Sequence, residues 1–204
     1  MRVALALLGL TSAMAVPVIA QQVSGVPGIH DATKVGSGTY NVEPDHTQVI
    51  FTVSHLGFTN YTGQFVQPTG SLVIDKAKPG NDKVDVVFDV AKITSTSDHL
   101  NEYIQKPEFF DAAKYPQGRF TSTSVVRNGD KAKITGNLTL KGVTKSVVLD
   151  ARFVGTGVDP MTKATIVGFA ASTSIKRSDF GISFGVPMIS DKVDLTINAA
   201  FAAQ

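Results

Sequence analysis

Residues 133–153 read KITGNLTLKGVTKSVVLDARF, and this stretch decides the fold class of the chain. Apolar residues alternate with polar ones before and after a turn at residues 141–144, which contains Gly142. Alternation with a period of two is typical of β-strands that bury one face, and the short connection makes the two strands a hairpin. The stretch predicts an antiparallel unit in which the chain doubles back on itself.

The same alternation extends in both directions from this hairpin. It is present at residues 49–54, 72–74 and 84–90, in a long strand expected at residues 163–176, and again at residues 193–201. About eight such strands fit either a sandwich or a closed barrel by pattern alone. Closure removes exposed strand edges, and the interior of an eight-stranded barrel has room for side chains or for one small ligand. We therefore expect an all-β fold, an antiparallel eight-stranded barrel.

One segment, residues 95–116, interrupts the alternation. It offers Ser and Asp residues as N-caps and Pro107 at a favourable first-turn position, so we expect two short helices within residues 98–112. Their apolar residues form one underside that lies across a sheet or covers an opening. These residues are Leu100, Tyr103, Ile104, Phe109 and Phe110.

The first twenty residues have the composition of a secretory signal peptide. Arg2 precedes an apolar run at residues 3–10, and the small residues Ala13, Ala15 and Ala20 offer cleavage sites. We expect cleavage after Ala20, with Ala15 as the alternative, and a periplasmic or secreted mature chain. No later stretch has the roughly 18 apolar residues of a membrane helix, so we expect a soluble chain without stable membrane insertion.

The mature chain is predicted to consist of an arm and one domain. Residues 21–38 are rich in Gly, Ser, Val and Pro without a period, which is typical of a flexible N-terminal arm. Residues 39–204 suit a single β-domain, because barrels of this length commonly form one unit.

Composition excludes several classes of function. Without Arg2 the chain has eighteen basic and seventeen acidic residues, interspersed along its length, so it lacks the concentrated basic surface that nucleic acid binding requires. Cysteine is absent, which excludes a thiol nucleophile, a thiolate metal site and stabilisation by disulfides. We predict no cofactor and no metal.

Four segments distributed over the mature chain form recognisable motifs. They are residues 45–57 (DHTQVIFTVSHLG), residues 98–116, residues 136–145 (GNLTLKGVTK) and residues 175–182 (IKRSDFGI). In this order and spacing they resemble the YceI-like family of polyisoprenoid-binding proteins. The resemblance implies an extended lipocalin-like barrel around a cavity that takes up an isoprenoid chain, in a protein of the periplasm.

The energetics of an apolar cavity favour long ligands. Burying one methylene contributes about 0.8 kcal/mol, whereas association costs on the order of 4 to 15 kcal/mol. The cavity therefore suits a polyisoprenoid, an isoprenoid quinone or a related lipid. The candidate ligand-binding residues are Phe51, Val53, Phe88, Phe120, Leu138, Leu149, Phe153 and Phe169 in the wall, with Leu100, Phe109 and Phe110 near the mouth. The alternative for each of them is packing in a dry core.

Residues 181–185 match the G-x-S-x-G motif of serine hydrolases, with Ser183 at its centre. In those enzymes the serine lies on a strained turn between a strand and a helix. Here the flanks continue an all-β chain, and Pro187 interrupts a following helix after one turn. We therefore expect no catalytic residue and no enzyme, with a serine hydrolase as a minor alternative.

Other polar residues within the motifs have structural explanations. His46 and His55 are nine residues apart, so they face opposite sides of a regular strand, and no recognised metal-ligand spacing is present. Asp45, Arg177 and Asp179 either form ion pairs or caps at the barrel rim or contact a polar head group, and the structural role is favoured.

We expect a protein for the non-catalytic binding, transport or storage of a long-chain lipid. The alternative of another class is a stress-related structural or interaction module with a dry core. A second copy of the chain could cover an exposed apolar mouth, which adds a homodimer to the expected partners.

Overall fold

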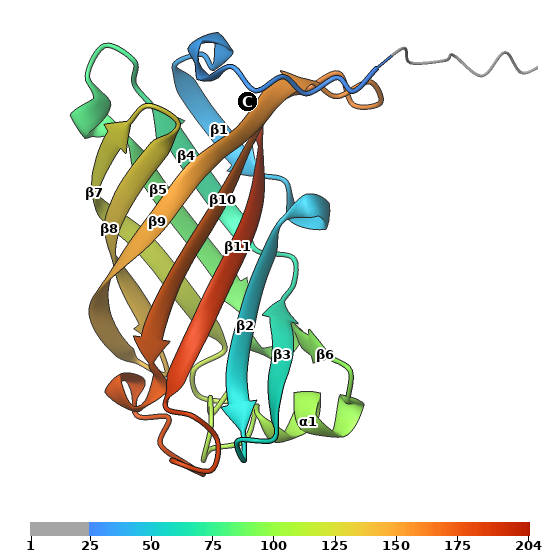
Figure 1. The fold of residues 1–204 in the computed structure, drawn as a ribbon, viewed down its shortest axis with the longest axis vertical. Helices are drawn as coiled ribbons and strands as arrows, with labels where there is room; N and C mark the ends of the chain where they lie inside the picture. Colours follow the sequence, from blue (N-terminus) through green and yellow to red (C-terminus); the bar gives the residue numbers. More distant parts are fainter. Residues whose placement is uncertain (1–24) are drawn as a thin grey trace, which may run out of the picture.

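The chain forms the antiparallel eight-stranded β-barrel that the alternation and the resemblance predict. The structure is a computed structural model and describes residues 25–204. Strands follow one another in the order β1-β4-β5-β7-β8-β9-β10-β11, and β1 pairs with β11 to close the ring (Figure 1). β2, β3 and β6 extend the sheet from the lower half of β11. The all-β prediction is confirmed, and closure decides between the barrel and the sandwich.

The strands are β1 (Gly38–Val42), β2 (Gln48–His55), β3 (Thr59–Phe65), β4 (Thr69–Ile74), β5 (Lys83–Asp89), β6 (Ile93–Ser95), β7 (Gln117–Asn128), β8 (Lys131–Leu140), β9 (Val143–Val158), β10 (Thr165–Lys176) and β11 (Lys192–Ala203). The helices within residues 25–204 are α1 (Asp98–Tyr103) and the 3-10 helices η1 (Ala32–Lys34), η2 (Pro44–His46), η3 (Pro79–Asn81), η4 (Val90–Lys92) and η5 (Arg177–Phe180).

β1 and β2 together form one interrupted strand along β11. η2 lies in the break, where Pro44 has no N–H to donate to a ladder. The Thr47 hydroxyl accepts a hydrogen bond from the backbone N–H of Ala200 at 3.0 Å and donates one to the carbonyl of the same residue at 3.2 Å. A side chain therefore replaces the missing backbone bonds, and the wall continues past the break.

Inward-facing side chains form two clusters of buried residues, one in each half of the barrel. The lower cluster includes Phe65, Phe88 and Phe120. The upper cluster includes Phe153 and Phe201. Two clusters rather than one continuous core are what a barrel shows when its side chains line the wall without filling the interior.

Only the first of the two expected helices forms. α1 begins after Ser97, whose side chain accepts a hydrogen bond from the Leu100 N–H. Residues 104–115 make consecutive turns in place of the second helix. Asp111 adopts a left-handed conformation with φ 51°, which an α-helix of L-residues cannot propagate through. Within residues 25–204, no helix is long and apolar enough to cross a membrane.

The described part of the predicted arm lies at the upper end of the barrel (Figure 1). Ile29 exchanges two backbone hydrogen bonds with Thr156, at 2.8 and 2.9 Å. Val35 is buried, and the Ser37 hydroxyl accepts a hydrogen bond from the Lys76 N–H at 2.9 Å. The segment is therefore attached to the barrel from Ile29 onward. The predicted signal peptide, residues 1–20, lies outside the described residues.

Candidate functional site

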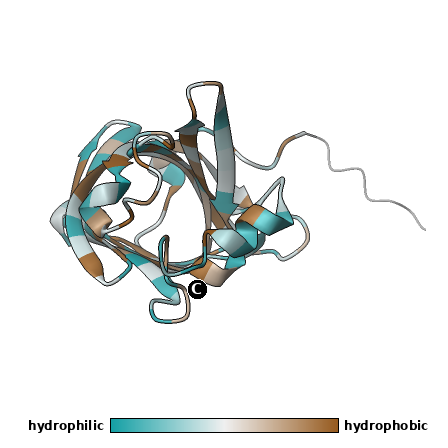
Figure 2. Cartoon of the chain, turned by 90° about the horizontal axis from the view of Figure 1, so that it is seen from below, coloured by the Kyte–Doolittle hydropathy of each residue, from teal (hydrophilic) through white to brown (hydrophobic). Residues whose placement is uncertain are grey.

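An apolar cavity of about 570 Å³ runs through the barrel. Its lining comes from both clusters of buried residues and includes Phe65 and Phe120 from the lower one and Phe153 and Phe201 from the upper one. This volume lies within the 300–1,000 Å³ typical of small-molecule sites. Figure 2 shows the strands as a ring seen from the lower end. The barrel is therefore hollow along most of its length.

Strand periodicity places the lining residues. Because alternate side chains of a strand point to opposite faces, each wall strand contributes a series of every second residue. On β10 this series is Phe169, Ala171, Thr173 and Ile175. The residues between them face outward, as the neighbouring Ala170 does beside the exposed Asn198 of β11, which does not line the cavity. A regular strand thus gives the cavity a continuous apolar wall.

Three phenylalanine rings lie flat against the wall because each covers a glycine of the neighbouring strand. A Cβ added to Gly63 would lie 2.4 Å from the ring of Phe51, and one added to Gly118 would lie 2.3 Å from the ring of Phe88. Gly136 has the same relation to Phe120, at 2.4 Å. Each glycine gives its ring a place beside the backbone. The three rings therefore lie directly over these glycines where they line the cavity.

All eleven residues predicted from the sequence as ligand-binding line this cavity. They are Phe51, Val53, Phe88, Leu100, Phe109, Phe110, Phe120, Leu138, Leu149, Phe153 and Phe169. The structure brings them together from strands and from the segment after β6. Their contact with a ligand stays a prediction, since lining a cavity and binding its occupant are different properties.

Sequence reasoning missed other lining residues that share a face with the predicted ones. Val84 and Val86 precede Phe88 on β5, and Ile134 precedes Leu138 on β8. Extending the period of two along each strand finds them. Arg127 escapes this rule, because an irregularity between Ser122 and Ser124 shifts the register of β7.

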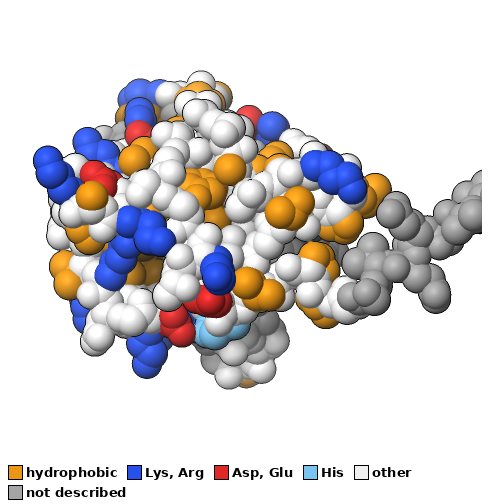
Figure 3. All heavy atoms as spheres, turned by 90° about the horizontal axis from the view of Figure 1, so that it is seen from above, with side chains coloured by type: hydrophobic (Ala, Val, Ile, Leu, Met, Phe, Trp, Pro, Cys, Tyr) orange, Lys and Arg blue, Asp and Glu red, His pale blue; other side chains and the backbone are white. Residues whose placement is uncertain are grey.

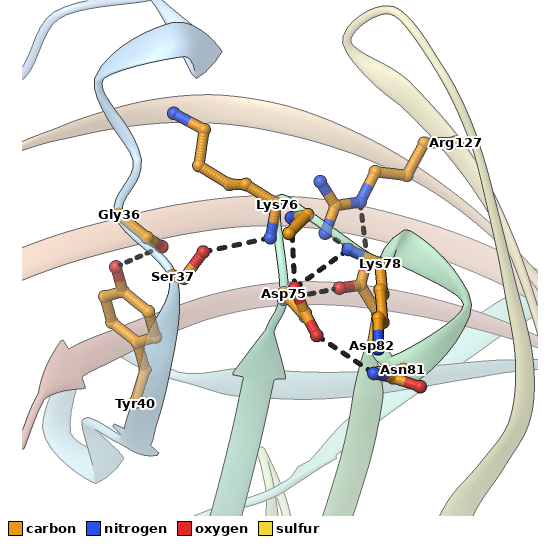
Figure 4. A network of polar contacts seen from close by, with 10 residues as sticks. Gly36, Ser37, Tyr40, Asp75, Lys76, Lys78, Asn81, Asp82 and Arg127 are labelled. Atoms are coloured by element: carbon orange, nitrogen blue, oxygen red, sulfur yellow. Dashed lines mark hydrogen bonds and ion pairs between the residues drawn. The ribbon is translucent and has the colours of Figure 1, made fainter.

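The upper end of the cavity is polar (Figure 4). Arg127 forms an ion pair and a hydrogen bond with Asp82, whose side chain is only 4% exposed. The other oxygen of this carboxylate accepts a hydrogen bond from the Asp75 N–H at 2.9 Å. Lys76 also lines this end, and its Nζ donates to the Thr33 carbonyl at 2.9 Å. Figure 3, seen from above, shows Lys and Arg side chains around hydrophobic ones at this end.

The lower end is covered mainly by aromatic side chains. The ring centroids of Tyr103 and Phe109 are 5.3 Å apart, and those of Phe109 and Phe184 are also 5.3 Å apart. Tyr103 and Phe109 belong to the segment between β6 and β7, whereas Phe184 belongs to the loop between η5 and β11. Lys141 joins the same two segments, because its Nζ donates to the carbonyls of Pro107 at 2.8 Å and Gly181 at 3.4 Å.

Arg177 fixes the loop between η5 and β11 from inside the protein. Its guanidinium donates hydrogen bonds of 2.8 to 2.9 Å to four backbone carbonyls of residues 182–190. The residue is 6% exposed, and this burial lowers the pKa of Arg177, while the nearby Asp191 carboxylate raises it. Arg177 therefore has the structural role that the sequence favours, with carbonyl groups as its partners.

The remaining polar candidates do not converge on a chemical site. Asp45 and His46 lie in η2, where the Glu43 side chain accepts hydrogen bonds from both backbone N–H groups. His55 lines the cavity from the other end of β2, where it forms a β-bridge with Ile189. Within residues 25–204, no group of three or more His, Asp or Glu residues has the geometry of a metal site.

Ser183 lacks the setting of a hydrolase nucleophile. The residues around it form turns between η5 and β11, and no helix follows Pro187. The strained strand-to-helix turn that exposes such a serine is therefore missing.

Comparison with known proteins is consistent with this architecture. Residues 40–201 match the model of the YceI-like domain. The chain belongs to the YceI-like family. Protein YceI of Escherichia coli O6:H1 is 38% identical over 162 residues, which cover 79% of this chain and 84% of that protein.

Solved structures share the fold of this YceI-like chain. BcnA of Burkholderia cenocepacia matches with a TM-score of 0.70 and 23% identity, covering 78% of this chain and 98% of that one. A polyisoprenoid binding domain from Saccharophagus degradans, implicated in plant cell wall breakdown, matches with a TM-score of 0.61 and 17% identity, covering 83% and 100%. At these identities the likeness establishes the barrel, and the ligand has to be argued from the cavity.

Proposed function

We propose that this chain binds one long-chain apolar molecule, a polyisoprenoid, an isoprenoid quinone or a related lipid, inside its barrel. The observation that carries the proposal is the apolar cavity of about 570 Å³ that continues past both clusters of buried residues. The chain would transport or store the lipid in the periplasm after removal of residues 1–20. Cell fractionation tests this location.

The dimensions and the chemistry of the cavity support a ligand of this class. Each methylene removed from water contributes about 0.8 kcal/mol, so several isoprene units are needed to exceed an association cost on the order of 4 to 15 kcal/mol. Charged side chains lie at the upper end, while the wall between the ends is apolar. A long chain with one polar end fits this distribution. The S. degradans domain of the same fold is a polyisoprenoid binding domain, which supports isoprenoids as the first ligands to test.

The role is one of binding, without covalent chemistry. Ser183 is exposed, outside the cavity lining, and has no nucleophile elbow around it. Arg177, which does line the cavity, directs its guanidinium to four carbonyls. Esterase activity that Ser183→Ala abolishes would contradict this view.

Mass spectrometry of an organic extract of the purified protein tests the proposal. The expected result is one predominant lipid in roughly equimolar amount. Ala171→Phe should lower the amount of lipid at least tenfold, because the new ring projects from β10 into the cavity. Ala170→Phe is the matched control, since Ala170 does not line the cavity and pairs with the outward-facing Asn198. Thermal melts report whether either variant still folds, and Ala171→Leu is a smaller probe of the same position.

Equal amounts of lipid in wild type and in both variants would contradict binding inside the barrel. An extract without lipid, together with no uptake of an added long-chain prenol, would favour the alternative of a dry interaction module. Sedimentation of the same samples tests the predicted homodimer.

A further inference from the structure

Two loops at the lower end of the barrel expose large apolar side chains. The β2–β3 turn carries Leu56 and Phe58, which are 45% and 88% exposed. The loop between η5 and β11 carries Phe184, Val186 and Met188, at 50%, 38% and 62%. We name these five residues the lower apolar patch. Exposed apolar side chains gathered in this way mark interaction sites.

The two loops form one surface. The Leu56 N–H donates to the Met188 carbonyl at 2.6 Å, and the Ser190 N–H donates to the Ser54 carbonyl at 2.9 Å. A β-bridge joins His55 to Ile189. Figure 1 shows the β2–β3 turn beside the loop between η5 and β11 at the bottom of the barrel. The patch is therefore a fixed arrangement of two segments.

The structure holds these side chains outside the barrel. The four carbonyls that bind Arg177 belong to Ile182, Phe184, Ile189 and Ser190, so the backbone on both sides of the exposed residues is anchored. A buried guanidinium at this position prevents the loop from collapsing inward. The patch is therefore exposed because the hydrogen bonds of Arg177 fix the loop in this position, and not because the loop is flexible.

The patch carries no formal charge and is continuous with the cavity. Residues 181–190 contain no Asp, Glu, Lys or Arg, and neither do residues 54–60. Phe184 belongs to the patch and also lines the cavity. The Lys141 ammonium lies beside the loop, where it donates to the Gly181 carbonyl at 3.4 Å. An apolar surface therefore extends from the interior of the barrel to its lower rim.

We propose that the lower apolar patch docks the protein on the surface of a lipid bilayer, with the patch inserted among the head groups and the outer acyl carbons. A bilayer offers hydrocarbon to the patch and, through Phe184, to the cavity at the same time. The protein attaches to zwitterionic phospholipid, because insertion of uncharged side chains is the attraction. That docking loads or unloads the cavity rests on the proposed function, whereas attachment itself does not.

Flotation of the purified full-length mature protein with phosphatidylcholine vesicles tests the docking. The wild-type protein should float with the vesicles, and raising the salt concentration should not release it. The double variant Phe58→Ser, Met188→Ser should lower the floated fraction at least tenfold. Neither residue lines the cavity, so uptake of an added long-chain prenol in the absence of vesicles should not change.

The matched control is Val158→Ser, Met161→Ser. Val158 is 54% exposed and is the last residue of β9, and Met161 is 89% exposed and follows it. Both lie at the opposite end of the barrel from the patch. The control should float as the wild type does.

Failure of the wild type to float, or equal flotation of the wild type and the patch variant, would overturn the proposal. So would self-association that the patch variant abolishes in the absence of vesicles, because a second copy would then be the occupant. If the extracts contain no lipid while flotation behaves as expected, the proposed function fails and the docking surface stands.

Discussion

The two ends of the barrel are closed by different chemistry. At the upper end, Arg127 and Asp82 form an ion pair, and the N-terminal segment adds hydrogen bonds through Ser37 and Lys76. At the lower end, aromatic rings cover the opening and Arg177 holds a loop by its carbonyls. The upper end thus depends on charged pairs and the lower end on apolar contact. The comparison shows that one cavity with an apolar wall can have a polar end and an apolar end.

The largest effect is expected from Arg177 at the lower end. Arg177→Met leaves four carbonyls, one buried and three partly buried, without their donor, and we expect a loss of about 3 kcal/mol in the free energy of unfolding. Denaturant unfolding measures this loss. Arg119→Met is the control, because Arg119 forms an exposed ion pair with Asp85 that solvent screens, so its loss should be much smaller. Equal losses in both variants would remove the special role of the buried arginine.

The second prediction concerns Gly118, which lies in the wall between the two ends. Gly118→Ala forces the ring of Phe88 away from the wall, since the added Cβ meets it at 2.3 Å. We expect a destabilisation of about 2 kcal/mol and a smaller capacity for lipid. Gly168→Ala is the control, because its nearest neighbour would lie 3.6 Å away, at ordinary contact distance. A neutral Gly118→Ala would mean that the rings are not held by the glycines.

A smaller effect is expected from the ion pair at the upper end. Arg127→Met leaves the buried Asp82 carboxylate with the Asp75 N–H as its remaining partner, and we expect a loss of about 1 to 2 kcal/mol, reduced by the partial exposure of Arg127. Lys133→Met, which breaks the exposed pair with Asp150, should cost at most about 0.5 kcal/mol. Equal losses of unfolding free energy in Arg127→Met and Lys133→Met would mean that the Arg127–Asp82 pair contributes no more than an exposed ion pair.

The smallest effect is a pH dependence of the N-terminal segment. The Val154 carbonyl, which accepts a hydrogen bond from Nδ1 at 2.9 Å, and the Asp130 carboxylate, 3.0 Å from Nε2, raise the pKa of His30 above 6.5. The folded state therefore favours the protonated ring of His30. The stabilisation that this ring gives to the attached N-terminal segment is fully present below pH 6.5 and is lost as the pH rises through the raised pKa of His30.

Hydrogen exchange of the Ile29 and Thr156 amides, corrected for the intrinsic effect of pH, reports this attachment. Protection of both amides should decrease as His30 loses its proton, and His30→Gln should abolish the decrease. Protection that does not change across this range would contradict a role for His30. Amides of β8 serve as the reference, since the barrel wall should be insensitive to this titration.

The strands and most of the cavity wall follow from the sequence because a single rule, alternation with a period of two, generates both. Phe169 and Phe153 are found in this way, and so are the neighbours that extend each series. Gly63 and Gly118 are not, because the sequence does not state which residue of the next strand lies opposite. Such pairs depend on register, which is a property of the closed barrel.

The polar parts of the candidate site depend on irregular backbone. Arg127 points into the cavity only because the register of β7 shifts between Ser122 and Ser124. The second expected helix is replaced by turns at residues 104–110, before the left-handed Asp111, and cap and proline rules do not predict this path. The sequence favours a structural role for Arg177 over contact with a head group, but its four carbonyl partners come from a loop whose path no local pattern determines.

A crystal structure of the protein as purified, without added lipid, tests the central claim most directly. We expect elongated electron density along the cavity, from the charged side chains around Arg127 to the aromatic rings around Phe109. The density should disappear in Ala171→Phe and persist in Ala170→Phe. An interior filled by the chain's own side chains, with no passage for a hydrocarbon, would contradict the account.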